Sequence, residues 1–136
     1  MNNTCFKYTG DPEFKGYYDT FIRSLHHISD EKNQIKEWKM EDHDLSIVFT
    51  FDEIYQTFID FCSTIIILYK DVGFSEEQLH MIKKLYDMVE NYDSTTGERD
   101  QNNDAIGKTD AQIADDPKWH VIREYAKHVY NELAKR

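Results

Sequence analysis

The chain has 136 residues, 26 of them acidic and 16 of them lysine or arginine, and its formal net charge at pH 7 is −10. This length is enough for one domain with a hydrophobic core, whereas the excess of acids argues against nucleic acid and anionic membranes as partners, because both bind basic surfaces. Two cysteines, Cys5 and Cys62, are too few for a disulfide framework, and residues 1–10 do not form a secretory leader, so we expect a cytoplasmic protein.

Two helical segments are predicted in the first 40 residues. Asp11 and Pro12 mark the start of the first segment, because aspartate caps free N–H groups and proline is tolerated at the first helical position. Apolar residues then recur every three or four positions, which indicates one buried face. The second segment covers residues 30–40, where the spacing of Ile35 and Trp38 suggests a helix.

The most apolar passage runs from residue 45 to about residue 71. It carries two neighbouring rows of apolar side chains at helical spacing, which predicts a helix buried on two sides, and its acidic residues exclude a membrane span. We expect this helix to begin at residue 45 with Asp44 as its cap, while Thr50 and Glu53 offer an alternative start as a capping box. Residues 45–51 also alternate as a strand would, but the sequence shows no second strand-like run to pair with them.

Two further helices have clear signals at their ends. Gly73 provides the residue that closes the apolar helix, and Ser75 with Gln78 forms a capping box for the next helix. Asp116 and Pro117 repeat the start signal of the first helix. The last helix is therefore predicted to begin at this pair.

Between these two helices, residues 94–116 contain almost no large apolar side chains. Thr109 and Gln112 are suited to cap a single turn near Ile113. A connection of this length within a compact domain is usually functional or disordered, so we predict a long, mobile loop.

Together these signals predict an all-α fold. We expect a single domain over residues 1–136, with a bundle of four to five helices around the apolar helix at about 45–71 and a long acidic loop at 94–116 before the last helix. Residues 1–10 are expected to be loosely held.

The acidic residues are concentrated in the predicted loop. Residues 93–116 hold seven acids against Arg99 and Lys108, a net charge of −5. Acidic surfaces increase the rate at which a protein meets basic partners, so we predict that the acids of this loop and of the corner before the apolar helix bind a basic protein. The predicted partner-binding residues are Asp42, Asp44, Asp100, Asp104 and Asp110.

Two patterns resemble parts of metal sites without completing one. His120, Glu124 and His128 follow one another at intervals of four residues on the last helix, but their row lies about 100° from the apolar row, which favours a solvated face. Asp100, Asn102 and Asp104 match only the first three ligand positions of a calcium loop, because alanine stands where the turn glycine and the closing glutamate are required. We therefore predict no metal and no cofactor.

The sequence contains no complete catalytic motif, so the favoured function is protein binding. One concrete form is an acidic bacterial immunity protein or antitoxin that neutralises a basic toxin such as a nuclease. The first alternative is a metal-dependent hydrolase that uses the histidines of the last helix or the pair His43 and Asp44. The second alternative is a structural or regulatory homo-oligomer that covers aromatic surface.

Overall fold

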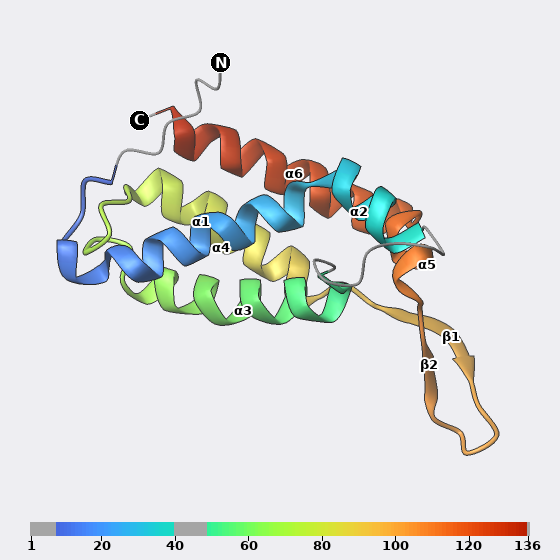
Figure 1. Ribbon diagram of the computed structural model, residues 1–136. Coiled ribbons are helices and arrows are strands. Elements are labelled where there is room, and N and C mark those ends of the chain that lie inside the picture. Colours follow the sequence, from blue (N-terminus) through green and yellow to red (C-terminus); the bar gives the residue numbers. More distant parts are fainter. Residues whose placement is uncertain (1–7, 40–48, 136) are drawn as a thin grey trace.

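The computed structural model describes residues 8–39 and 49–135, and helices make up most of this part of the chain (Figure 1). In chain order the elements are η1 Pro12–Phe14, α1 Lys15–Ser29, α2 Glu31–Lys39, α3 Phe51–Ile67, α4 Glu76–Glu90, β1 Thr95–Arg99, β2 Ala105–Gly107, α5 Asp110–Ala114 and α6 Pro117–Ala134. The predicted helical class is confirmed. The predicted binding residues Asp42 and Asp44 lie outside the described residues.

The four longest helices share one core. Helix α1 packs against α3 and α6, α4 packs against the same two helices, and the shorter α2 contacts α5. The largest side chains that are buried completely include Trp119, Tyr18, Phe21 and Phe58, which come from three of these helices. The further prediction that a bundle of four or five helices surrounds one central apolar helix stays a prediction.

Helix α3 begins at Phe51, so the predicted start at residue 45 is wrong. Thr50 has an extended backbone, its side chain accepts a hydrogen bond from the N–H of Glu53, and the Glu53 carboxylate accepts one from the N–H of Thr50. This capping box satisfies two N–H groups that lack a partner at the start of a helix. A helix that continued through Thr50 would bond these N–H groups to its own carbonyl groups and would not need the cap. The alternative start was therefore the correct one.

Helix α3 ends at Ile67 with Leu68 as its C-cap, so its predicted end near residue 71 is wrong. Turns cover residues 68–73, and Gly73 closes them with φ 89° while the N–H of Phe74 donates to the carbonyl of Tyr69 at 2.8 Å. The predicted starts of α4 and α6 are confirmed. Ser75 and Gln78 cap α4 reciprocally, and the Asp116 side chain accepts from the N–H of Lys118 at the start of α6. No helix among the described residues combines the length and the apolar character needed to cross a membrane.

Helix α2 buries one apolar and one polar side chain. Trp38 is buried and Gln34 is only 1% exposed, whereas Ile35 is 39% exposed. The amide of Gln34 takes part in hydrogen bonds with α1 and α6, and these bonds allow a polar side chain to be buried. The helix predicted over residues 30–40 is therefore confirmed, and Gln34 with Trp38 forms its buried face.

The prediction of a long loop at 94–116 is also wrong. Strands β1 and β2 pair as an antiparallel hairpin, and α5 follows with Thr109 and Gln112 as its capping box. Ile113 and Ala114 of α5 are buried, so this end of the segment belongs to the core. The hairpin escaped prediction because its strands are short and carry few apolar residues.

Candidate interaction surface

The β1–β2 hairpin projects from the helical body as a separate arm (Figure 1). We call residues 95–107 the hairpin arm. Every residue from Gly97 to Gly107 is exposed, and none of the arm is buried. A two-stranded hairpin without a packed face is only marginally stable by itself, so local hydrogen bonds and the connection to the body must hold the arm in place.

A dense set of hydrogen bonds orders the tip of the arm. The N–H of Asp100 donates to the carbonyl of Asp104 at 2.9 Å, and one carboxylate oxygen of Asp100 accepts from the N–H groups of Asn102 and Asp104. Asn103 has φ 66°, a conformation that asparagine tolerates better than most residues. The Asp100 carboxylate is therefore a structural part of the turn, which explains the spacing that resembles a calcium loop.

The base of the arm is fixed by three side chains that we call the arm anchor, namely Tyr92, Lys108 and Asp116. Lys108 Nζ lies 2.8 Å from Asp116 Oδ2, and the Tyr92 hydroxyl donates to the same oxygen at 2.7 Å. The Tyr92 ring continues into the core, with its centroid 5.2 Å from that of Trp119. The anchor therefore connects the exposed arm to the buried ring of Trp119.

Ionisation in the arm anchor follows from these contacts. Burial by itself raises the pKa of the Asp116 carboxyl, but the hydrogen bonds from Lys108 and Tyr92 outweigh burial and hold this pKa below its ordinary value. Burial and the hydrogen bond to Asp116 raise the pKa of the Tyr92 phenol. Asp116 is therefore charged and Tyr92 neutral at pH 7, as the anchor requires.

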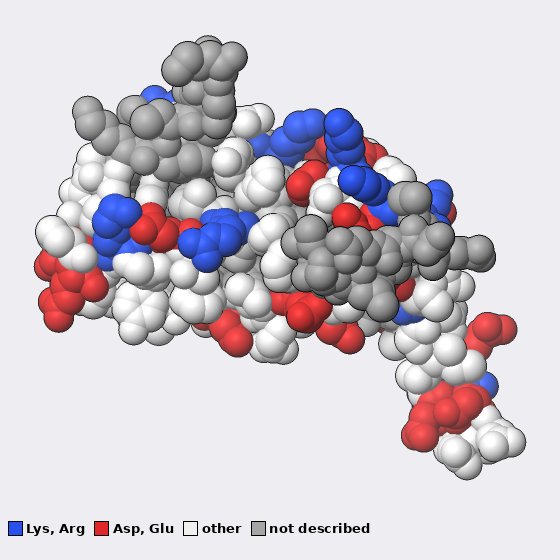
Figure 2. Space-filling model, in the orientation of Figure 1, with Lys and Arg blue, Asp and Glu red and all other residues white. Residues whose placement is uncertain are grey.

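The cations in and beside the arm are held by internal contacts, which leaves two acids of the arm available. Arg99 donates to the carbonyl of Asn103 at 2.8 Å, and Lys108 is held in the anchor. Among the described residues, no lysine, arginine or histidine forms an ion pair with Glu98 or Asp104. Acidic atoms dominate the charged surface of the arm (Figure 2). The arm therefore presents two carboxylates that are available to pair with a cation of another molecule.

The structure separates the predicted binding residues. Asp100 and Asp104 lie together at the tip, but Asp110 lies in the first turn of α5, where its carboxylate accepts from the N–H of Phe51 at 3.2 Å. Partial burial raises the pKa of the Asp110 carboxyl, with the nearby acids of α3 acting in the same direction. Sequence reasoning did not select Glu98, whose position only becomes informative once β1 is known.

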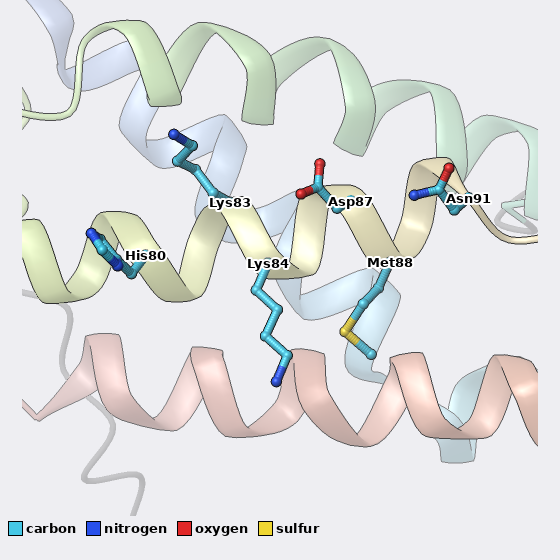
Figure 3. A pocket seen from close by; sticks show the side chains of 6 residues that line it. All are labelled: His80, Lys83, Lys84, Asp87, Met88 and Asn91. Carbon is cyan, nitrogen blue, oxygen red and sulfur yellow. The ribbon is translucent and has the colours of Figure 1, made fainter.

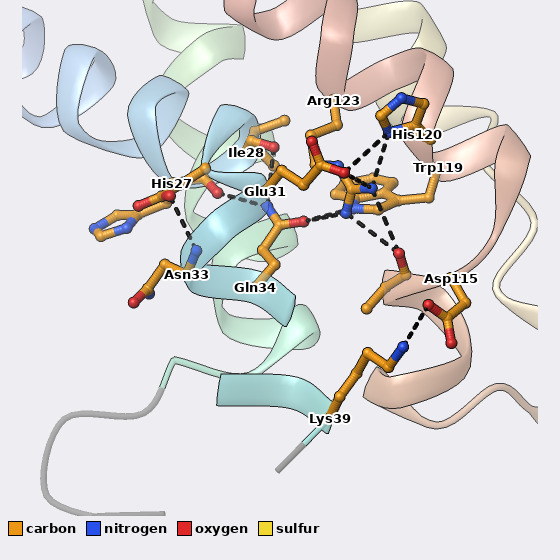
Figure 4. A network of polar contacts seen from close by, with 12 residues as sticks. His27, Ile28, Glu31, Asn33, Gln34, Lys39, Asp115, Trp119, His120 and Arg123 are labelled. Carbon is orange, nitrogen blue, oxygen red and sulfur yellow. Dashed lines mark hydrogen bonds and ion pairs between the residues drawn. The ribbon is translucent and has the colours of Figure 1, made fainter. Parts of the chain in front are cut away.

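A second polar cluster connects α1, α2 and α6 inside the body (Figure 4). The side-chain nitrogen of Gln34 donates to the carbonyls of His27 and Ile28, and its oxygen accepts from Trp119 Nε1 and Arg123 Nη1, both at 3.0 Å. All the hydrogen-bonding capacity of this amide is used. Arg123 is only 2% exposed, so the cluster holds a buried charge in place.

The same cluster contains a group of potential metal ligands. Ligand atoms of Glu31, His120 and Glu124 lie within 4.8 Å of one another, whereas the sequence pattern had suggested His120, Glu124 and His128. However, Arg123 Nη2 lies 2.9 Å from His120 Nδ1 and 3.4 Å from a Glu31 oxygen. The guanidinium therefore already provides the positive charge between these groups, and it would repel a metal ion.

A hollow of about 600 Å³ lies on the outer face of α4. Its lining side chains come from this helix and from its C-cap Asn91, and they include Lys83, Lys84 and Asp87 (Figure 3). Lys84 Nζ lies 4.8 Å from the centre of the Tyr125 ring, which is a cation–π contact. These charged side chains are exposed, so the hollow lacks the dry enclosure that a catalytic site requires.

Comparison with models of protein families, with curated proteins and with solved structures finds no match to this chain. The hairpin arm and its charges are the features of the molecule that point to a function.

Proposed function

We propose that this protein is an acidic binding module whose hairpin arm engages a basic protein. The observation that supports the proposal most strongly is an ordered, exposed arm whose Glu98 and Asp104 lack an ion-pair partner among the described residues. A partner cation that approaches these acids neutralises charge without displacing a cation of this chain. Such complementarity increases association rates and selects against acidic competitors.

A specific form of this function is neutralisation of a basic toxin such as a nuclease by an immunity protein or antitoxin. Nucleases bind phosphates with clustered lysine and arginine residues, and the carboxylates at the end of a narrow arm are suited to occupy such a cluster. The net charge of −10 supports this choice of partner. The proposal includes a cytoplasmic location, supported by Cys62, which is free and buried.

Affinity capture from the native host at low salt tests the proposal. The bait is the full chain, the test variant is Glu98→Lys/Asp104→Lys, and the control variant is Glu13→Lys/Glu77→Lys. The control produces the same change in net charge at two exposed residues outside the arm. We expect wild type and control to retain one predominant basic protein that the arm variant loses.

Added salt should release the captured protein, because its association depends on exposed charges. Loss of binding in both variants would indicate a nonspecific effect of net charge. Retention by the arm variant would contradict the proposal that the arm is the binding surface.

The rival function is metal-dependent hydrolysis, and the group formed by Glu31, His120 and Glu124 is the observation in its favour. Metal analysis of the purified protein separates the two functions. Stoichiometric metal that is lost from Glu31→Gln and His120→Gln would favour the hydrolase. The arm proposal predicts that metal content does not change the binding of the basic partner.

A further inference from the structure

The outer edge of β2 has the geometry of a site for an additional strand. Asp104 and Lys108 direct their backbone groups to β1, since the Asp104 carbonyl accepts from Asp100 and the Lys108 N–H donates to Ser94. Alternate residues of a strand direct their backbone groups to opposite sides. Ala105 and Gly107 therefore point their N–H and C=O groups away from β1, and no described strand lies on that side.

The described surroundings of this edge leave it open. All three residues of β2 are exposed, and among the described residues the only atom that a Cβ on Gly107 would meet within 4 Å is the Ser94 carbonyl oxygen, at 3.9 Å. The strand carries no proline, charge or bulge of the kind that protects exposed edges. Ile106, 38% exposed, adds an apolar side chain beside the edge.

The outer edge of β1 is blocked by contrast. The N–H of Thr95, which points away from β2, donates to the Asp93 carboxylate at 2.9 Å. The register shifts between Thr95 and Arg99, and Gly97 has φ 87° within this irregularity. A bulge of this kind interrupts the ladder that an additional strand needs. Only the β2 edge is therefore suited to strand addition.

We propose that an extended, basic segment of the partner protein adds to the β2 edge as a third strand of the hairpin arm. This inference rests on the proposed function and specifies its mode of binding. Backbone hydrogen bonds from Ala105 and Gly107 hold the segment, and Glu98 and Asp104 select its lysine and arginine side chains. A second copy of this chain is the disfavoured occupant, because it brings another charge of −10 and the same acids.

A synthetic peptide of alternating lysine and valine is a suitable probe. Hydrogen exchange measured by NMR on the full chain, with and without saturating peptide, reports on each backbone amide. We expect the amides of Ala105 and Gly107 to gain protection while that of Thr95 does not change. Absence of protection at Ala105 and Gly107 overturns the proposed strand addition.

The same peptide with a methyl group on every backbone nitrogen is the matched control, because it keeps the charges and cannot complete a ladder. We expect it to bind about tenfold more weakly, as the loss of one or two hydrogen bonds implies. Equal affinity overturns the proposal. The matching change in the protein is Ala105→Pro, which removes one outward N–H and should weaken peptide binding by a similar factor. Protection of the Ile106 amide in this variant verifies that the hairpin persists.

The variant Glu98→Gln/Asp104→Asn separates this inference from the proposed function. If it loses the peptide but wild type shows no protection at the β2 edge, the acidic arm remains the binding surface and strand addition is overturned. If it binds the peptide as wild type does, both proposals fail. Protection of Ala105 and Gly107 in concentrated protein without peptide identifies a second copy as the occupant and overturns the choice of a basic partner.

Discussion

The helical body and the hairpin arm are stabilised in different ways. The body buries aromatic and aliphatic side chains from α1, α3, α4 and α6 around a fully satisfied Gln34 amide. The arm buries no residue and depends on turn hydrogen bonds and on the anchor at its base. Substitutions in the body should therefore change stability, whereas substitutions on the arm should change binding with little effect on stability.

The largest effect is expected from a cavity in the core of the body. Phe58→Ala removes a side chain that is completely buried in α3. The free energy of unfolding, measured by urea denaturation, should fall by about 3–5 kcal/mol. Ile67→Ala in the same helix is the control, because Ile67 is 79% exposed and its loss should cost about 0.5 kcal/mol or less. Similar losses in both variants would show that α3 is placed incorrectly.

A smaller loss is expected when the polar cluster of the body is opened. Gln34→Ala leaves Trp119 Nε1 and one donor of the buried Arg123 without their acceptor. Unfolding experiments should show a loss of about 3 kcal/mol, because unpaired buried donors keep their cost of desolvation. Lys36→Ala, an exposed change in the same helix, should leave the urea midpoint unchanged. An unchanged midpoint for Gln34→Ala would show that the cluster adds no stability.

The arm anchor should contribute less than the body and should depend on pH. Asp116→Asn keeps a side chain that can cap α6 but removes the charge paired with Lys108, at an expected cost of about 1–2 kcal/mol at pH 7. The pKa of the folded Asp116 is depressed, so its contribution is complete above the unfolded value of about 3.9 and is lost as pH falls through the folded value. Urea curves of wild type and variant should therefore converge in strong acid. A constant difference across the whole pH range would contradict this account of the anchor.

The sequence predicted the body better than the arm, for physical reasons. Apolar periodicity and paired capping residues, such as Ser75 with Gln78, are local signals that survive in the folded state. By contrast, the burial of Gln34 depends on partners far along the chain, and the strands of the arm have no apolar face to produce a pattern. Asp100 and Asp104 could be selected by charge, whereas the structural role of Asp110 required its contact with Phe51 to be known.

Glu98 and Asp104 of the hairpin arm are expected to have the smallest effect on stability and the largest effect on binding. The most direct measurement is the association rate with the captured basic protein over a series of salt concentrations, for wild type and Glu98→Lys/Asp104→Lys. Urea midpoints of the two proteins are measured in parallel. We predict that the variant associates about tenfold more slowly or worse at low salt, with a weaker salt dependence and an unchanged midpoint. Equal rates with the same salt dependence would contradict the central claim that the hairpin arm is the binding surface.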